Sequence, residues 1–95
     1  MTTKTSAREI HKFRVPCPTT PSFGLDLPAG AEILDVQMQH GHTQLWALVD
    51  PQAPTQRRDF QIVGTGRPVA ADLQYVGTWQ DHDGVFVWHL FVRAL

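Results

Sequence analysis

The chain has 95 residues, 42% of them apolar, and a formal net charge of −1. This length leaves room for one domain only, the near-neutral charge excludes the uniformly basic surface of an extended nucleic-acid contact, and no run of about 20 apolar residues could cross a membrane. Because Cys17 is the single cysteine, an intrachain disulfide is excluded, and we expect a protein of a reducing cytoplasm.

The first eight residues carry no apolar pattern, so we expect a disordered arm over residues 1–8 and a single β domain over residues 9–95. The domain begins with a predicted edge strand from Ile10 to Val15, because closely spaced prolines follow it and prevent regular pairing. A second short strand, Phe23 to Leu27, ends in the turn signal Pro28-Ala29-Gly30.

The segment from Ile33 to Pro51 has the pattern of a β-hairpin. Apolar residues alternate on both arms, and Gly41 lies between the arms, where a tight turn needs positive φ. We take Gly41-His42 as the two turn residues. In that register one face of the hairpin is apolar and is directed to the core: Leu34, Val36, Met38, Leu45, Ala47 and Val49.

The opposite face of this hairpin is mixed, with Gln37 opposite Trp46 and Asp35 nearby. Tryptophan is usually buried, which favours a ring covered by another strand or by the proline-rich connector. The alternative is an exposed Trp46 ring that serves as a platform for a ligand or a partner protein.

The C-terminal half contains three further predicted strands. The first runs from Arg57 to Val63, and the last two lie within Leu73 to Trp79 and Val85 to Val92. Asp83-Gly84 between these two is a strong signal for a type I′ turn. The last strand is apolar on both faces, which is typical of a central strand.

No helical period persists over about 11 residues anywhere in the chain. The sequence therefore predicts an all-β fold, a small antiparallel β-sandwich or partly open barrel of about six or seven short strands. We expect the following residues to be mostly buried: Leu34, Val36, Leu45, Ala47, Phe60, Ile62, Val76, Leu90 and Phe91.

Patterns for catalysis and metal binding are weak. Zinc needs three or four converging ligands, and the histidines at the predicted turns do not have a known ligand spacing, so we expect no metal and no cofactor. His89 lies between apolar residues of a predicted strand, where we expect a hydrogen bond to a neighbour such as Thr78. Since Cys17 and the serines have no sequence-near base, we do not expect an enzyme.

The arginines suggest a binding site. Arg57 and Arg58 begin a predicted strand whose far end is Gly64-Thr65-Gly66-Arg67. Two glycines allow successive backbone N–H groups to point at one anion, although the same glycines occur in ordinary turns. The candidate site for a small anionic, nucleotide-like ligand consists of Arg57, Arg58, Gly64, Thr65, Gly66, Arg67, Trp46 and Gln37.

Several short motifs occur along the chain in this order: IHKF at 10–13, LPAGAEIL at 27–34, LWALVDP at 45–51, GTG at 64–66, YVGT at 75–78 and VWHLF at 87–91. In these motifs the chain resembles a family of small uncharacterised proteins encoded by bacteriophages and prophages. Members of that family often have GTGH where this chain has Arg67 after the second glycine, so no role of a histidine carries over. The resemblance implies action by binding, in the cytoplasm of a host bacterium.

Two expectations from different classes follow from this resemblance. The first is a non-enzymatic counter-defence protein, a homo-oligomer that binds and sequesters a small nucleotide-derived immune signal. The second is a protein–protein inhibitor of a bacterial defence effector, comparable to an anti-CRISPR protein, that uses the sheet face around Trp46. A minor virion or assembly protein is a third alternative. None of these functions involves a membrane.

Overall fold

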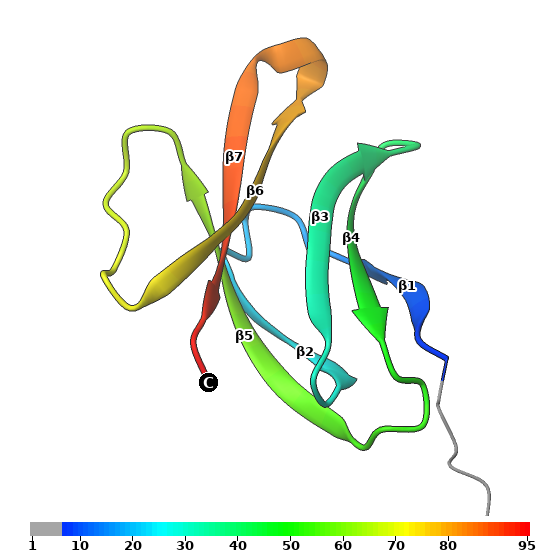
Figure 1. The fold of residues 1–95 in the computed structure, drawn as a ribbon. Coiled ribbons are helices and arrows are strands. Elements are labelled where there is room, and N and C mark those ends of the chain that lie inside the picture. The colour runs from blue at the N-terminus through cyan, green and yellow to red at the C-terminus, as the bar shows by residue number, and fades with distance from the viewer. Residues whose placement is uncertain (1–6) are drawn as a thin grey trace, which may run out of the picture.

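The computed structural model describes residues 7–95, except for the side chain of His82. Of the predicted arm, residues 1–6 lie outside the described residues, and Ala7 and Arg8 are exposed ahead of the first strand. The elements are β1 (Glu9–Arg14), β2 (Ser22–Pro28), β3 (Glu32–Gln39), β4 (His42–Val49), β5 (Thr55–Gly64), β6 (Leu73–Asp81), the single turn η1 (His82–Gly84) and β7 (Phe86–Arg93) (Figure 1).

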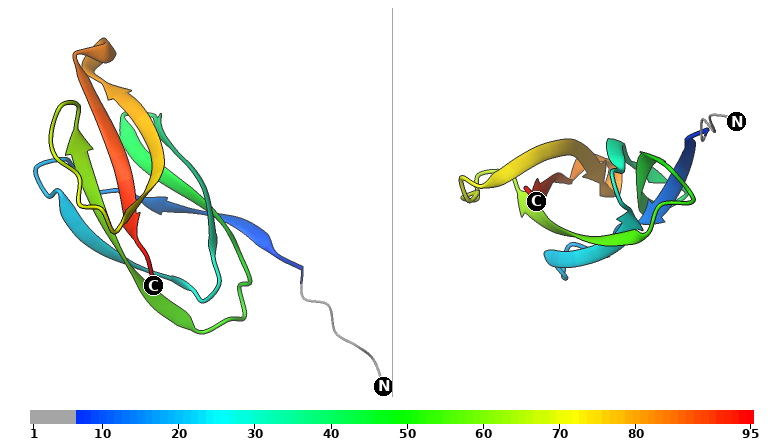
Figure 2. Two further views of the ribbon diagram at one scale, coloured as in Figure 1. Left: turned by 60° about the vertical axis from the view of Figure 1, so that its left-hand side comes forward. Right: turned by 60° about the horizontal axis from the view of Figure 1, so that its bottom comes forward.

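The seven strands form two antiparallel sheets that pack face to face (Figures 1 and 2). Sheet A has the order β1-β4-β3, and sheet B has the order β2-β5-β7-β6. The predicted all-β sandwich is confirmed, and β7 is a central strand of sheet B, as its two apolar faces indicated. Within the described residues, no helix is long and apolar enough to span a bilayer.

The core lies between the two sheets and is built from alternate residues of each strand. Both sheets supply side chains that are fully buried: Leu27, Val36, Leu45, Val49 and Leu90. Most of the predicted core residues are buried, whereas Val76 and Phe91 are half-buried. Leu34 is 42% exposed, so its predicted core position is wrong.

The β3–β4 hairpin turns one residue earlier than predicted. Its central residues are His40, with φ 49°, and Gly41, with φ 79°, and Gln39 pairs with His42. A type I′ turn needs positive φ at both central residues and favours glycine at the second of them. Gly41 therefore takes the second central position, after His40, and not the first, before His42. Each residue of β3 near the turn thus pairs with a β4 residue two positions away from the expected one. Because side chains alternate with a period of two, the same residues still face inward there.

A β-bulge in β3 explains the exposure of Leu34. The register with β4 shifts between Ile33 and Asp35, so Leu34 is the extra residue and its side chain leaves the core face. Ile33 takes the inward position and packs against the core. The sequence does not show this bulge, because both Ile33 and Leu34 are apolar.

The β6–β7 hairpin has the predicted turn, with positive φ at Asp83 (55°) and Gly84 (89°). Trp79 pairs with Trp88, as predicted. A second bulge, between Tyr75 and Gly77, leaves Val76 unpaired, so Phe91 lies opposite Tyr75 and not opposite Val76 as expected. Each of the edge strands β3 and β6 thus carries one bulge.

Strands β3 and β6, the edges of the two sheets, contact each other at Gly77. A Cβ atom at this buried glycine would lie 2.7 Å from Cγ1 of Val36, which is itself fully buried. Only a residue without a side chain allows the two backbones to come this close. Gly77 therefore sets the distance between the sheets along this edge.

We expect Gly77→Ala to lower the free energy of unfolding by about 1 to 3 kcal/mol, the usual effect of an extra methyl group in a packed core. Chemical denaturation measures this change. Gly64→Ala is the matched control, because its Cβ would lie 3.4 Å from Cζ3 of Trp88, in ordinary van der Waals contact. If both substitutions change the free energy of unfolding equally, the contact between β3 and β6 does not require a glycine at position 77.

Candidate functional site

The eight residues predicted to bind a ligand lie in three separate places. Gln37 and Trp46 are on the outer face of sheet A, where Trp46 is half-buried between Lys12 of β1 and Asp35 of β3. Arg57 and Arg58 are near the start of β5, and Gly64 to Arg67 follow at its far end. The structure therefore does not bring these eight residues into one pocket.

Arg57 and Arg58 point to opposite faces of sheet B, since successive residues of a strand alternate. Arg57 is exposed on the outer face, where its Nε donates a hydrogen bond of 2.9 Å to Oδ1 of Asp59. Its guanidinium lies against Gly24, at which a Cβ atom would be 2.4 Å from Cζ of Arg57. The charge of Arg57 is thus already compensated by a neighbouring carboxylate.

Arg58 is half-buried on the inner face, beyond the point where β5 and β7 pair, because Phe60 and Val92 form the last pair at that end. Its Nε is buried and has no hydrogen-bond partner, and its guanidinium forms no ion pair within the described residues. Buried polar atoms in proteins are almost always hydrogen bonded. The other guanidinium nitrogens also make no hydrogen bond within the described residues, and they are the candidate donors to an anion from outside the chain.

A pocket of about 240 Å³ surrounds Arg58, which we call the Arg58 pocket. Its other lining residues come from β6, β7 and the start of β3: Ala31, Ile33, Gln74, Tyr75, Val76 and Val92. Among the described residues that line it there is no carboxylate, so the positive charge of Arg58 is not compensated locally.

The two bulges explain why the pocket is open. Strands β3 and β6 touch at Gly77 and diverge toward the end where Leu34 and Val76 are the extra residues. Bulges bend a strand and turn side chains to new directions, and they are frequent next to functional sites. Here they separate the two sheet edges next to the Arg58 side chain.

The loop after β5 is an ordinary turn. Arg67 N–H donates to the carbonyl of Gly64 at 3.1 Å, and Gly66 has φ 88°, the positive φ of a type II turn. One of the backbone donors proposed for an anion is therefore used inside the turn. The Arg67 side chain remains exposed.

Thr65 belongs to a string of hydrogen bonds across the outer face of sheet B. Its hydroxyl is 2.8 Å from Nε2 of His89, Nδ1 of His89 is 2.9 Å from the Thr78 hydroxyl, and that hydroxyl is 2.6 Å from the Tyr75 hydroxyl. The predicted bond between His89 and Thr78 is confirmed, although His89 is half-buried on the outer face and not in the core. Both ring nitrogens are satisfied, so His89 connects β6, β7 and the β5 turn.

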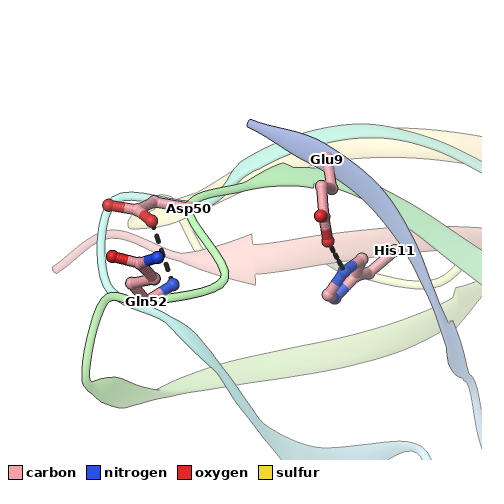
Figure 3. A network of polar contacts seen from close by, with 4 residues as sticks. All are labelled: Glu9, His11, Asp50 and Gln52. Carbon is pink, nitrogen blue, oxygen red and sulfur yellow. Dashed lines mark hydrogen bonds and ion pairs between the residues drawn. The ribbon is translucent and has the colours of Figure 1, made fainter. Parts of the chain in front are cut away.

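Figure 3 shows another polar group, near the start of β1 and the β4–β5 turn. His11 Nε2 is 2.8 Å from a carboxylate oxygen of Glu9, and the backbone N–H of Gln52 donates to Oδ1 of Asp50 at 3.0 Å. These are local contacts between residues two apart. No group of three or more His, Cys, Asp or Glu side chains in the described part of the chain converges as metal ligands do.

Cys17 is exposed on the connector between β1 and β2. A hydrogen bond from the backbone N–H of Thr19, with a second one from the Thr19 hydroxyl, lowers the pKa of the Cys17 thiol below its ordinary value. We assign this thiol no function.

A family model with the description "Domain of unknown function (DUF7352)" matches residues 6–95. The chain belongs to this family. The match covers all seven strands and the Arg58 pocket, and the family description states neither an activity nor a source. No curated protein and no solved structure matches the chain. The expected phage origin therefore stays a prediction.

Sequence reasoning named Arg58 but did not separate it from Arg57. The signal was present, because Phe60 and Ile62 were placed inward and the period of two in a strand then directs Arg58 inward as well. It missed Gln74 and Tyr75, which line the pocket. Their position depends on the bulge at Val76, which has no sequence signature.

We expect Arg58→Met to raise the free energy of unfolding by about 1 kcal/mol, because an apolar side chain of similar length replaces a half-buried guanidinium that lacks a partner. Arg57→Met is the control, and it should lower stability by about 0 to 1 kcal/mol through loss of an exposed ion pair. Thermal and urea unfolding of both variants give the comparison. A marked destabilisation by Arg58→Met would mean that Arg58 is a structural residue.

We expect the Cys17 thiol to be alkylated at lower pH than free cysteine, because a lowered pKa increases the thiolate fraction at any pH below it. The rate of reaction with iodoacetamide as a function of pH measures the midpoint. Thr19→Ala should move the midpoint upward, since it removes the hydroxyl donor and keeps the backbone donor. Thr20→Ala should leave the midpoint unchanged.

Proposed function

We propose that the protein is a non-enzymatic binding protein that holds the anionic group of a small ligand in the Arg58 pocket. The observation that carries this proposal is the half-buried Arg58, whose Nε is buried without a partner. Phosphate and carboxylate oxygens match the planar donor fork of a guanidinium, and they supply the acceptors that the chain does not.

Tyr75 lines the edge of the pocket, and its ring lies on the outer face of sheet B. Its ring packs edge-on against Phe91, with ring centroids 5.6 Å apart, and its hydroxyl is held 2.6 Å from the hydroxyl of Thr78. The side chain is nevertheless 61% exposed. A ring that is held in place before binding loses little conformational entropy when a flat ligand stacks on it. A planar group that reaches from the anion around the edge of β6 would find such a surface here.

The pocket volume of about 240 Å³ lies just below the range of about 300 to 1,000 Å³ usual for ligand pockets. It therefore suits a phosphate or carboxylate group and a small part of the molecule that carries it. The remainder of a larger ligand would lie over Tyr75 or in solvent.

Sequestration of a nucleotide-derived immune signal by a phage protein is the finer form of this proposal. The motif resemblance and the combination of Arg58 with a fixed aromatic ring support it. In this form Arg58 has the central role, and the loop from Gly64 to Arg67 does not take part.

The expected alternative, a protein–protein inhibitor, is favoured by one observation. The outer face of sheet A carries Ile10, which is 62% exposed, together with the bulged Leu34 and the half-buried Trp46 and Leu48. Exposed apolar groups on a flat sheet face are typical of protein contacts. No observation favours a virion or assembly protein.

Isothermal titration calorimetry tests the proposal with a panel of inorganic phosphate, adenosine monophosphate, ADP-ribose and cyclic dinucleotides. We expect at least one of these anions to bind, and Arg58→Met to weaken its binding by about 30-fold or more, because the loss of a desolvated charged contact costs about 2 to 5 kcal/mol.

The matched control is Arg57→Met, which removes the same charge one residue away and should change the affinity by less than about threefold, as for a solvated rim charge. If no anion of the panel binds to the wild-type protein, the pocket proposal is wrong. If both arginine variants lose affinity for the anion equally, the binding reflects the overall charge of the protein and not a specific contact with Arg58.

A further inference from the structure

The outer face of sheet B has a pocket of its own, which we call the outer pocket. Its volume is about 260 Å³, and all four strands of the sheet line it, with side chains that include Ser22, Arg57, Asp59, Gln61, Leu73 and Arg93. Arg58 lies on the opposite face of the sheet, because successive residues of a strand alternate. Among the described residues, none lines both the outer pocket and the Arg58 pocket, so the two are separate.

The charges at the outer pocket are paired within the chain. Arg57 donates through Nε to Oδ1 of Asp59 at 2.9 Å, and Arg93 donates through Nη1 to Oδ2 of Asp72. Each ion pair offers both N–H donors and carboxylate acceptors, and the two charges of a pair cancel. The outer pocket can therefore donate and accept hydrogen bonds without selecting an anion.

Gly24 leaves the space that the Arg57 guanidinium occupies. Gly24 pairs with Asp59 across β2 and β5, and a Cβ atom on this glycine would lie 2.4 Å from Cζ of Arg57. Together with the hydrogen bond to Asp59, this contact holds the guanidinium across the two strands. A planar donor group that is fixed before binding loses little conformational entropy when a ligand binds.

An aromatic surface adjoins the outer pocket. Gln61 pairs with Phe91, and Phe91 pairs with Tyr75, so one row of the sheet leads from the pocket to the two rings. The exposed Tyr75 ring packs edge-on against Phe91, and its hydroxyl is 2.6 Å from the hydroxyl of Thr78. This ring is therefore held in place and open to solvent beside the polar groups.

We propose that the outer pocket and the Tyr75 ring bind a neutral saccharide. A pyranose has an apolar face of C–H groups that packs on an aromatic ring, and its hydroxyl groups each donate and accept hydrogen bonds. The outer face of sheet B offers both kinds of surface side by side, and its compensated charges suit a ligand without charge. The Arg58 pocket takes a different class of ligand on the other face, so this proposal does not depend on the anion proposed there.

An NMR titration of the isotope-labelled protein with maltose, cellobiose, lactose and chitobiose tests the proposal. At least one of these saccharides should shift the backbone resonances around Gln61 and Arg93 until the shifts saturate. Arg57→Met should raise the dissociation constant of that saccharide by about tenfold or more, because hydrogen bonds from a charged donor are lost. Gly24→Ala should weaken binding in the same direction and keep the fold, since its methyl group displaces only the end of the Arg57 side chain.

Arg14→Met is the matched control for Arg57, because it removes an exposed arginine from sheet A and should change the saccharide affinity by less than about threefold. Tyr75→Leu should raise the dissociation constant about tenfold, because the aromatic contact is lost. Tyr75→Phe keeps the ring and should change the affinity by less than about threefold.

A wild-type protein that binds none of these saccharides overturns the proposal. So does saccharide binding that either Arg57→Met or Tyr75→Leu leaves unchanged. If glucuronic acid binds and none of the neutral saccharides does, the outer pocket selects charge, and a neutral ligand is the wrong class.

Discussion

The close contact between Gly77 and Val36 determines how the rest of the molecule is arranged. At this one point the edge strands of the two sheets come within the distance that an absent side chain allows. The contact closes the sandwich along β3 and β6. On one side of it both strands are bulged and diverge, which leaves space for an arginine inside the sandwich.

Two departures from the usual burial of apolar groups and exposure of polar groups lie at the two ends of β7. Near its C-terminal end lies the half-buried Arg58, whose Nε is buried without a partner, and at its N-terminal end large apolar side chains are exposed to solvent. Buried polar groups and exposed apolar groups are the informative departures from ordinary burial, because each costs stability unless something outside the chain compensates it. Both departures lie on one hairpin and on the β5 strand beside it.

The strands and turns followed from the sequence because period-two alternation and the turn residues act locally. Asp83-Gly84 could be located within its hairpin, whereas the single glycine at 41 fitted either central position of a turn. The bulges at Leu34 and Val76 could not be predicted, because they depend on how two sheets meet and not on neighbouring residues. The pocket depends on those bulges, so the sequence identified Arg58 but placed it in a site with residues from the far end of β5.

The strand order of sheet B also has a consequence for the folding rate. β5 and β6 are consecutive in the chain, but β7 lies between them. The pairing of β5 with β7 therefore has to close the segment between Gly64 and Trp88, which contains all of β6. Such non-local pairing is slow, because loop-closure entropy is lost before the new contacts compensate it. We infer that this pairing, together with the equally non-local pairings of β1 with β4 and of β2 with β5, limits the folding rate of the sandwich.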